Sequence, residues 1–448
     1  MTLSVGQEAM WLLHRMAPDS AAYNVALAVC LRGEVDGVAL DRAVRMVVRR
    51  HPELRSVYRE ADGLLRKEIA DDVPWGLDVR DGPHATVADV AAQPFDLGNR
   101  VFRAVLVRGE ADTVLTLVTH HIGSDATSQW LLLRDLVNAY RAVVDGTAPE
   151  WPRLLATYED FAEAERHSLS GTRGAELREY WRQVCAAAPP AELVPDLPRR
   201  AGGQPEGESC RIDLPEEVAL AARETARRLS VTPAALLAGC LQALLYRLTG
   251  RSRFLVGVPG SVRLRRAFRD VVGHLANTMV LRADIDADAT CAVLAAAADR
   301  RLKEGMAHVD LPHAVLRRTV RADGSPLCRI GFTVLNTDVV QPPLPMAAAG
   351  SATGHEITWR GLRLALLDVP QMAGQFDLAV EVRHGRRELN FVVKYDRGLF
   401  RPATAARFGD QLARVVRTAA ADPHVAVAEL SLVDDGEVER LLALGTGS

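Results

Sequence analysis

Cysteine is scarce in this chain, and its spacing excludes the common cysteine-based metal and redox sites. The six cysteines are scattered, and no two of them form a CxxC pair. None stands at metal-binding spacing from a histidine either. We therefore expect small buried thiols in a reduced compartment, with no bound metal and no bound cofactor.

Lysine is scarcer still, because only Lys67, Lys303 and Lys394 occur among 54 basic residues. We attribute this arginine bias to a GC-rich genome rather than to function. The formal net charge is only −3, so the whole chain has no electrostatic attraction to nucleic acid or to a membrane surface.

Long apolar runs are absent as well. No run reaches the roughly 18 residues that a membrane span needs. The opening residues, MTLSVGQEAMW, lack the basic and apolar regions of a signal peptide. We expect a cytoplasmic protein that contacts no membrane.

The length of 448 residues is too great for one ordinary core, so two lobes of about 150–250 residues are expected. A stretch rich in proline, glycine and alanine, 186–207, is the best linker. It separates an N-terminal lobe, 1–185, from a C-terminal lobe, 208–448. Strands and helices are mixed in both halves, which favours two α/β lobes around one ligand-binding cleft.

Hydrophobic periodicity predicts the main elements of both lobes. Asp36 and the pair Ser124–Asp125 precede two of the helices as caps. Helices are predicted at 5–16, 38–50, 126–144, 215–229, 233–248, 291–306 and 403–420. Strands are predicted at 23–31, 102–107, 113–119, 254–258, 329–335, 377–383 and 389–395.

A tandem histidine, His120–His121, ends the strand predicted at 113–119. Side chains alternate along a strand, so only one of the two rings can face a given cleft. That ring can act as a general base, because imidazole titrates near pH ~6.5. A histidine pair alone is more often structural than catalytic. Asp125 completes an HHxxxD pattern, but a helix cap explains it equally well.

Further segments surround this motif in a fixed order. They are LSVGQEAMWLLHRMAPDSAAYN near the N-terminus, RRHPELRSVY (49–58), HHIGSDATS (120–128), YEDFAEAE (158–165), PPAELVPDLPR in the linker, VGVPGSVR (256–263), VGHLANTMVLR (272–282), MAHVDLPHAVL (306–316) and SPLCRIGFTVLN (325–336). In identity, order and spacing the series resembles the condensation domain of nonribosomal peptide synthetases. HHxxxD, in place of a paired-aspartate motif, argues against the heterocyclisation type.

The resemblance implies an α/β (α+β) fold of two chloramphenicol acetyltransferase-like lobes, arranged as a V-shaped pseudo-dimer with a central tunnel. It also implies carrier proteins that deliver substrates on 4′-phosphopantetheine arms. His121 would be the catalytic base and His120 would brace the loop. Asp125 would form a structural ion pair with Arg55 rather than relay protons.

By the same resemblance, the substrate tunnel would be lined by Ala126, Ser128, Asn277 and Asn336. Two departures stand out. Ala126 replaces the usual glycine and loses its freedom at positive φ. The segment that begins at His308 reads His–Val–Asp, where the family usually has His–Gln–Asp. These changes put the usual substrate choice in doubt.

The resulting expectation is a free-standing enzyme of nonribosomal peptide or antibiotic biosynthesis. No adenylation-type glycine-rich loop and no carrier-type GGxS serine occurs in the sequence. The enzyme would join a carrier-bound acyl thioester to an amine or alcohol acceptor, forming an amide or an ester. It would work as a monomer, because its two lobes are covalently joined. Two alternatives stay open: an acyl-CoA-dependent acyltransferase of the same superfold, and a non-catalytic domain that recruits a synthetase partner.

Overall fold

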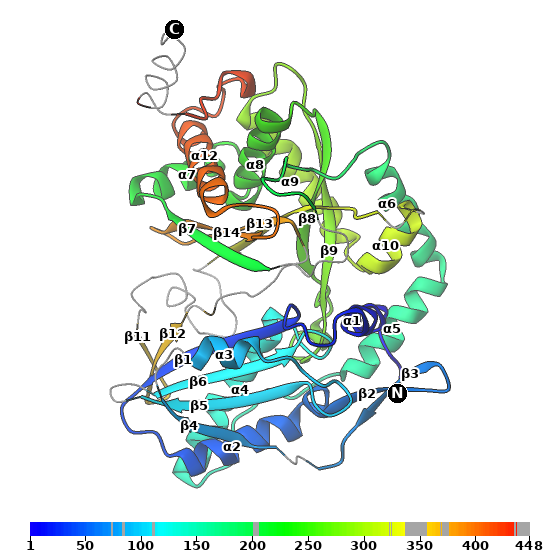
Figure 1. The fold of residues 1–448 in the computed structure, drawn as a ribbon, viewed down its shortest axis with the longest axis vertical. Coiled ribbons are helices and arrows are strands. Elements are labelled where there is room, and N and C mark those ends of the chain that lie inside the picture. The colour runs from blue at the N-terminus through cyan, green and yellow to red at the C-terminus, as the bar shows by residue number, and fades with distance from the viewer. Residues whose placement is uncertain are drawn as a thin grey trace.

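The chain forms two lobes, one above the other, each built on its own sheet (Figure 1). This computed structural model describes residues 1–72, 75–82, 86–109, 113–199, 206–321, 323, 325–336, 356–367, 369, 376–433 and 436. Within these residues, no single helix is long and apolar enough to cross a membrane. Helices α7 and α8 together pass the test of length and composition, but they meet at a bend of 102°.

The sheet of the N-terminal lobe has the strand order β11-β12-β1-β6-β5-β4. Its strands are β1 (Asn24–Arg32), β4 (Leu77–Asp81), β5 (Phe102–Arg108), β6 (Thr113–His120), β11 (Glu356–Trp359) and β12 (Leu362–Leu367). Helices α2 (Gly37–Arg50) and α4 (Ala126–Asp145) pack on one face of it and bury one apolar core. Helices α1 (Val5–Met16) and α3 (Thr86–Ala92) and the hairpin of β2 (Ser56–Ala61) and β3 (Leu64–Ile69) complete the lobe.

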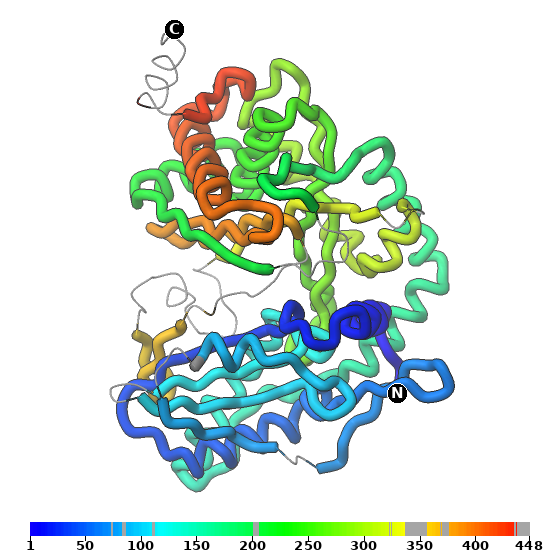
Figure 2. The backbone as a smooth tube through the Cα atoms, viewed as in Figure 1, coloured from blue at the N-terminus to red at the C-terminus, as the bar shows by residue number. Residues whose placement is uncertain are grey.

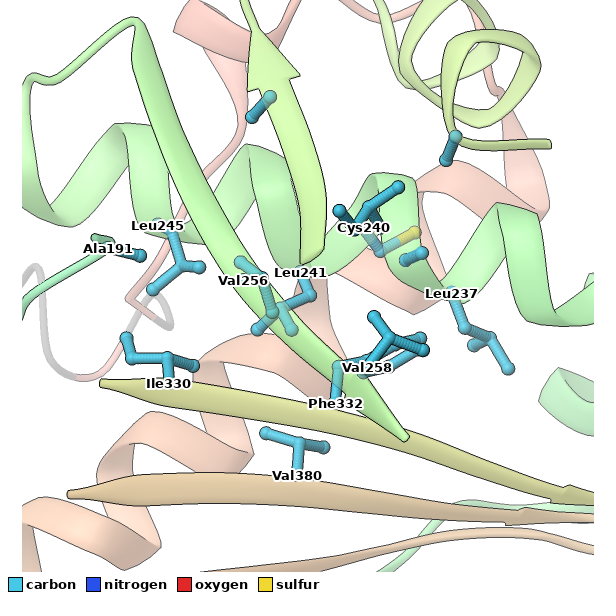
Figure 3. Close-up of a cluster of buried hydrophobic side chains, with 14 of the residues drawn as sticks. Ala191, Leu237, Cys240, Leu241, Leu245, Val256, Val258, Ile330, Phe332 and Val380 are labelled. Atoms are coloured by element: carbon cyan, nitrogen blue, oxygen red, sulfur yellow. The ribbon is translucent and has the colours of Figure 1, made fainter. Parts of the chain in front are cut away.

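The sheet of the C-terminal lobe has the order β7-β14-β13-β10-β8-β9. Its strands are β7 (Gly207–Asp213), β8 (Arg253–Ser261), β9 (Ala276–Asp284), β10 (Ile330–Asn336), β13 (Leu378–His384) and β14 (Leu389–Asp396). Its helices are α7 (Glu216–Arg228), α8 (Pro233–Thr249), α9 (Cys291–Ala307), α10 (His313–Val320) and α12 (Pro402–Ala421). Helix α6 (Thr172–Cys185) falls within the expected N-terminal lobe but packs on the core of the C-terminal lobe. Helix α5 (Tyr158–Ser170) packs against residues 268–275. Leucines of α8 interlock with alternate residues of β8, β10 and β13 in the core (Figure 3).

The predicted helices and strands are present, with ends shifted by a few residues at most. The helix ends follow from local chemistry. Asp36 accepts hydrogen bonds from the first amides of α2, and Asp125 caps α4 in the same way. Gly250, at φ +67°, ends α8 in a left-handed conformation that suits glycine.

Two segments cross between the lobes. Strand β12 pairs antiparallel with β1, so residues 356–367 belong to the N-terminal sheet although they fall within the expected C-terminal lobe. The β8–β9 connection, 262–275, reaches α4 of the N-terminal lobe through Arg263. The predicted linker runs beside β8, where Ala191 N–H donates to the Leu255 carbonyl (2.9 Å).

Candidate active site

A cavity of about 1380 Å³ lies between the lobes. Its walls include residues of α1, α5 and α10, the start of β1, and the inner strands of the C-terminal sheet. Helix α1, dark blue in Figure 2, lies at the boundary between the lobes. The volume exceeds the usual range of small-ligand pockets, roughly 300–1,000 Å³, so an extended substrate or two substrates can fit.

The tandem histidine lies at the end of β6, and its two rings take different sides. His120 pairs with Asn24 of β1 at the end of the ladder, and its buried ring packs near His14, Tyr23 and Phe95. His121 follows the strand, and its side chain lines the cavity. The prediction that only one of the two rings faces the cavity is therefore confirmed.

His120 is buried away from the cavity. Burial, and to a lesser degree the neighbouring histidines, holds its pKa well below the usual 6.5. Its Nδ1 accepts a hydrogen bond from the Ile122 amide (3.1 Å). A neutral ring that accepts from the loop backbone can brace the loop, and His120 is not among the described residues that line the cavity.

The hydrogen-bond partner of His121 defines its tautomer. His121 Nδ1 lies 2.7 Å from the Ser124 carbonyl oxygen. A carbonyl only accepts, so Nδ1 carries the hydrogen and Nε2 keeps its lone pair. Because the ring lines the cavity, this lone pair is available to remove a proton from a bound nucleophile.

Asp125 holds this loop against the C-terminal lobe. Its carboxylate accepts from Arg263 Nη1 (2.5 Å), the Ser128 amide (2.8 Å) and the Leu275 amide (3.0 Å). Burial alone would raise the pKa of Asp125, but the Arg263 charge and the hydrogen bonds from Arg263 and Ser128 outweigh it and lower the pKa.

The predicted pairing of Asp125 with Arg55 is wrong. Arg55 ends a short 3-10 helix, and its guanidinium donates to the backbone carbonyls of Val48 and Ala70. Arg263 takes its place because the β8–β9 connection carries it across the lobe boundary to α4. Arg263 ends the segment VGVPGSVR, which resembles the family, but the resemblance assigned it no role.

The expected tunnel residues divide into two groups. Ala126 and Asn277 line the cavity. The Asn277 amide also donates to the Val309 and Leu311 carbonyls (2.7 and 2.6 Å), so this side chain is fixed. Ala126 is the first residue of α4. Helical backbone angles suit any residue, so the replacement of glycine carries no conformational penalty there.

Ser128 and Asn336 do not line the cavity in the described part of the chain. The buried Ser128 hydroxyl donates to the Gly273 carbonyl (3.0 Å) and accepts from Arg263 Nη2 (2.8 Å), behind the cavity wall. On β10 the lining residue is Thr333. Asn336, three positions later, points to the opposite face of the strand and is exposed.

Two residues that line the cavity, His274 and Glu165, were not predicted from the sequence as site residues. The His274 ring stands 4.7 Å from the His121 ring, centroid to centroid. His274 lies in VGHLANTMVLR, one of the segments that resemble the family, but the resemblance assigned no role to this histidine. Glu165 of α5 accepts from the Val5 amide (2.7 Å), and burial, as the main cause, raises its pKa to about 7.

Comparison with known proteins finds relatives over nearly the whole chain. A family model described as "Condensation domain" matches residues 1–442. The phosphinothricin tripeptide synthetase PhsB of Streptomyces viridochromogenes is 32% identical over 98% of this chain and 37% of its own length. The phosphinothricin tripeptide synthetase PhsC of the same organism is 30% identical over 98% of this chain and 41% of its own length. This chain thus spans less than half the length of these relatives.

Solved structures share the fold. The X-domain from teicoplanin biosynthesis superposes with a TM-score of 0.84 at 23% identity, covering 96% of this chain and 97% of that one. The starter condensation domain of rhizomide synthetase, in complex with C8-CoA and Leu-SNAC, gives 0.81 at 20% identity, covering 97% of both chains. The architecture is therefore the chloramphenicol acetyltransferase-like fold of condensation domains.

Proposed function

Because the chain belongs to the condensation-domain family of nonribosomal peptide synthetases, we propose that it transfers an acyl group from a thioester to an amine or alcohol acceptor. The donor is an acyl or aminoacyl group on the 4′-phosphopantetheine arm of a carrier protein. The product is an amide or an ester. The family as a whole supports amide-bond-forming acyl transfer.

The observation that carries the proposal is the state of His121. Its Nδ1 donates to a carbonyl of its own loop, while its ring lines a cavity large enough for both reactants. A histidine with one nitrogen held and the other free at a binding cavity is arranged as a general base.

The acceptor nitrogen or oxygen attacks the thioester carbon, and His121 Nε2 takes the proton that the acceptor loses. An alcohol needs this base more than an amine does, because its proton must leave as the new bond forms. The tetrahedral intermediate then releases the thiolate, to which His121 returns the proton. One C–S bond breaks and one C–N or C–O bond forms.

A donor for the developing oxyanion lies beside this base. Ala126 begins α4, so its amide N–H has no partner within the helix. The N-terminus of a helix also carries partial positive charge. Ala126 N–H is therefore suited to stabilise the intermediate's oxyanion, and Ala126 lines the same cavity as His121.

The rim of the cavity suits a phosphopantetheine arm. Leu12 and Met16 of α1 are 61% and 81% exposed. They share this side of the cavity with Arg317 and Arg318 of α10. Apolar residues beside two guanidinium groups fit a pantetheine chain that ends in a phosphate, so we place a carrier-protein entrance here.

Competition between acceptors tests the proposal. A phosphopantetheinylated carrier protein loaded with octanoyl or leucyl groups is offered an amine and an alcohol together, and products are identified by mass spectrometry. We expect one acceptor class to dominate, and His121→Ala to lose at least about 100-fold in rate. His167→Ala, an exposed site on α5, serves as the matched control. Full activity of His121→Ala would disprove the assigned base.

The same experiment separates the alternatives. Octanoyl-CoA used more efficiently than octanoyl carrier would favour an acyl-CoA-dependent acyltransferase. The teicoplanin X-domain forms a complex with OxyB. Stable capture of a synthetase partner, with no turnover of any thioester, would favour a recruitment domain instead.

A further inference from the structure

His274 brings a second imidazole to the proposed base from the other lobe. It lies in the β8–β9 connection, and the two ring planes stand at 81°. His274 Nδ1 is 3.2 Å from His121 Nδ1. On its other side, α1 presses against the ring. A Cβ added at Gly6 would lie 2.6 Å from His274 Cδ2.

Only one arrangement of hydrogens satisfies both contacts of His121 Nδ1. The Ser124 carbonyl, at 2.7 Å, requires a hydrogen on this nitrogen. A protonated Nδ1 cannot also accept, so the contact at 3.2 Å must present the lone pair of His274 Nδ1. The Nδ1–H of His121 is thus shared between two acceptors, the Ser124 carbonyl and His274 Nδ1. His274 carries its own hydrogen on Nε2.

The surroundings keep His274 neutral. Burial, followed by the nearby His121, lowers the pKa of His274 to about 3; Asp125 and a hydrogen bond to the His121 backbone oppose this shift, and Arg263 adds to it. The Tyr158 hydroxyl of α5 donates to the His274 carbonyl (3.1 Å) and fixes the backbone. The ring therefore accepts hydrogen bonds without competing for a proton.

We propose that His274 is a positioning residue that, together with the Ser124 carbonyl, holds His121 in its Nδ1–H tautomer and leaves Nε2 as the base. When His121 is protonated during the reaction, the same contact stabilises its Nδ1–H. His121 belongs to one lobe and His274 to the other, so the base is completed only where the lobes meet. The catalytic meaning of this contact rests on the proposed function, but the contact itself does not.

The test is nuclear magnetic resonance of the full chain with ¹⁵N-labelled histidine, which reports the tautomer of each ring without substrate. The His121 signal is assigned by its loss in His121→Gln. In His274→Leu we expect partial loss of the Nδ1–H tautomer of His121, seen as a shift of both of its ring ¹⁵N signals, because one acceptor is gone. His274→Asn offers an amide oxygen at the same place and should restore the wild-type behaviour.

His313→Leu is the matched control. His313 also lines the cavity, but its Nδ1 hydrogen bond goes to the Thr278 carbonyl (3.0 Å). The His313→Leu variant should leave the His121 signal unchanged. Unchanged ¹⁵N shifts of His121 in His274→Leu, or equal shifts in the leucine and asparagine variants, would overturn the proposal. If turnover is found, kcat should fall in His274→Leu and recover in His274→Asn. A chain without turnover would refute the function and leave the His274 result standing.

Discussion

Replacing Asp125 with alanine should destabilise the whole molecule, not only its chemistry. The Asp125 and Arg263 side chains are 2% and 6% exposed. The same carboxylate also accepts from two backbone amides, Ser128 and Leu275. Asp125→Ala therefore leaves a guanidinium charge buried without its partner and uncaps α4.

Breaking a buried pair from one side costs about 3–5 kcal/mol, a large part of the roughly 5–15 kcal/mol that stabilises a typical domain. The sign of the pH dependence follows from the lowered pKa of Asp125. The stabilisation is fully present at pH values above the pKa of Asp125 in the unfolded chain, near ~4. It is lost as the pH falls through the lower pKa that Asp125 has in the folded chain.

Urea unfolding followed by circular dichroism measures this loss. Asp270→Ala is the control, because Arg134 Nη1 also contacts Asp270 from α4 (2.5 Å), but this carboxylate is 34% exposed. Such a pair contributes about 0–1 kcal/mol. Asp125→Asn combined with Arg263→Met removes both charges and should recover much of the loss. An inactive Asp125→Ala that unfolds at the wild-type urea concentration would refute the reasoning.

Three further perturbations have clear expected outcomes. Glu165 has a folded pKa raised to about 7, so its ionisation weakens the folded state as the pH rises from about 4.5 to about 7. Glu165→Gln should therefore be more stable than wild type by about 2–3 kcal/mol at pH ~8 and similar at pH ~4 in urea titrations. Gly6→Ala should displace the His274 ring and lower kcat severalfold, with little change in unfolding by urea. If His274 keeps its ¹⁵N shifts in this variant, the close approach is not what fixes the ring. Arg317→Glu with Arg318→Glu should lower kcat/KM about tenfold or more for a carrier-bound donor and much less for an N-acetylcysteamine thioester. Equal losses for both donors would place the carrier entrance elsewhere.

Local sequence patterns were enough to predict the helices and strands and to identify the family. The apolar run Thr113–Thr119 located the strand that delivers His120 and His121, and this strand is buried on both faces. Asp125 was correctly placed as the cap of α4, since capping depends on neighbours in the chain. The ordered motifs predicted the condensation-domain fold, which the family match and the superposed structures confirm.

The tertiary structure decided which distant residues meet. Arg55 and Arg263 are equivalent as charges, and only the path of the β8–β9 connection brings Arg263 to Asp125. The same connection places His274 beside His121, although the two histidines are far apart in the sequence. The sequence determined the parts of the site, since these depend on short-range periodicity and residue chemistry. The structure determined their pairing, because contacts between lobes depend on how two sheets pack around one cavity.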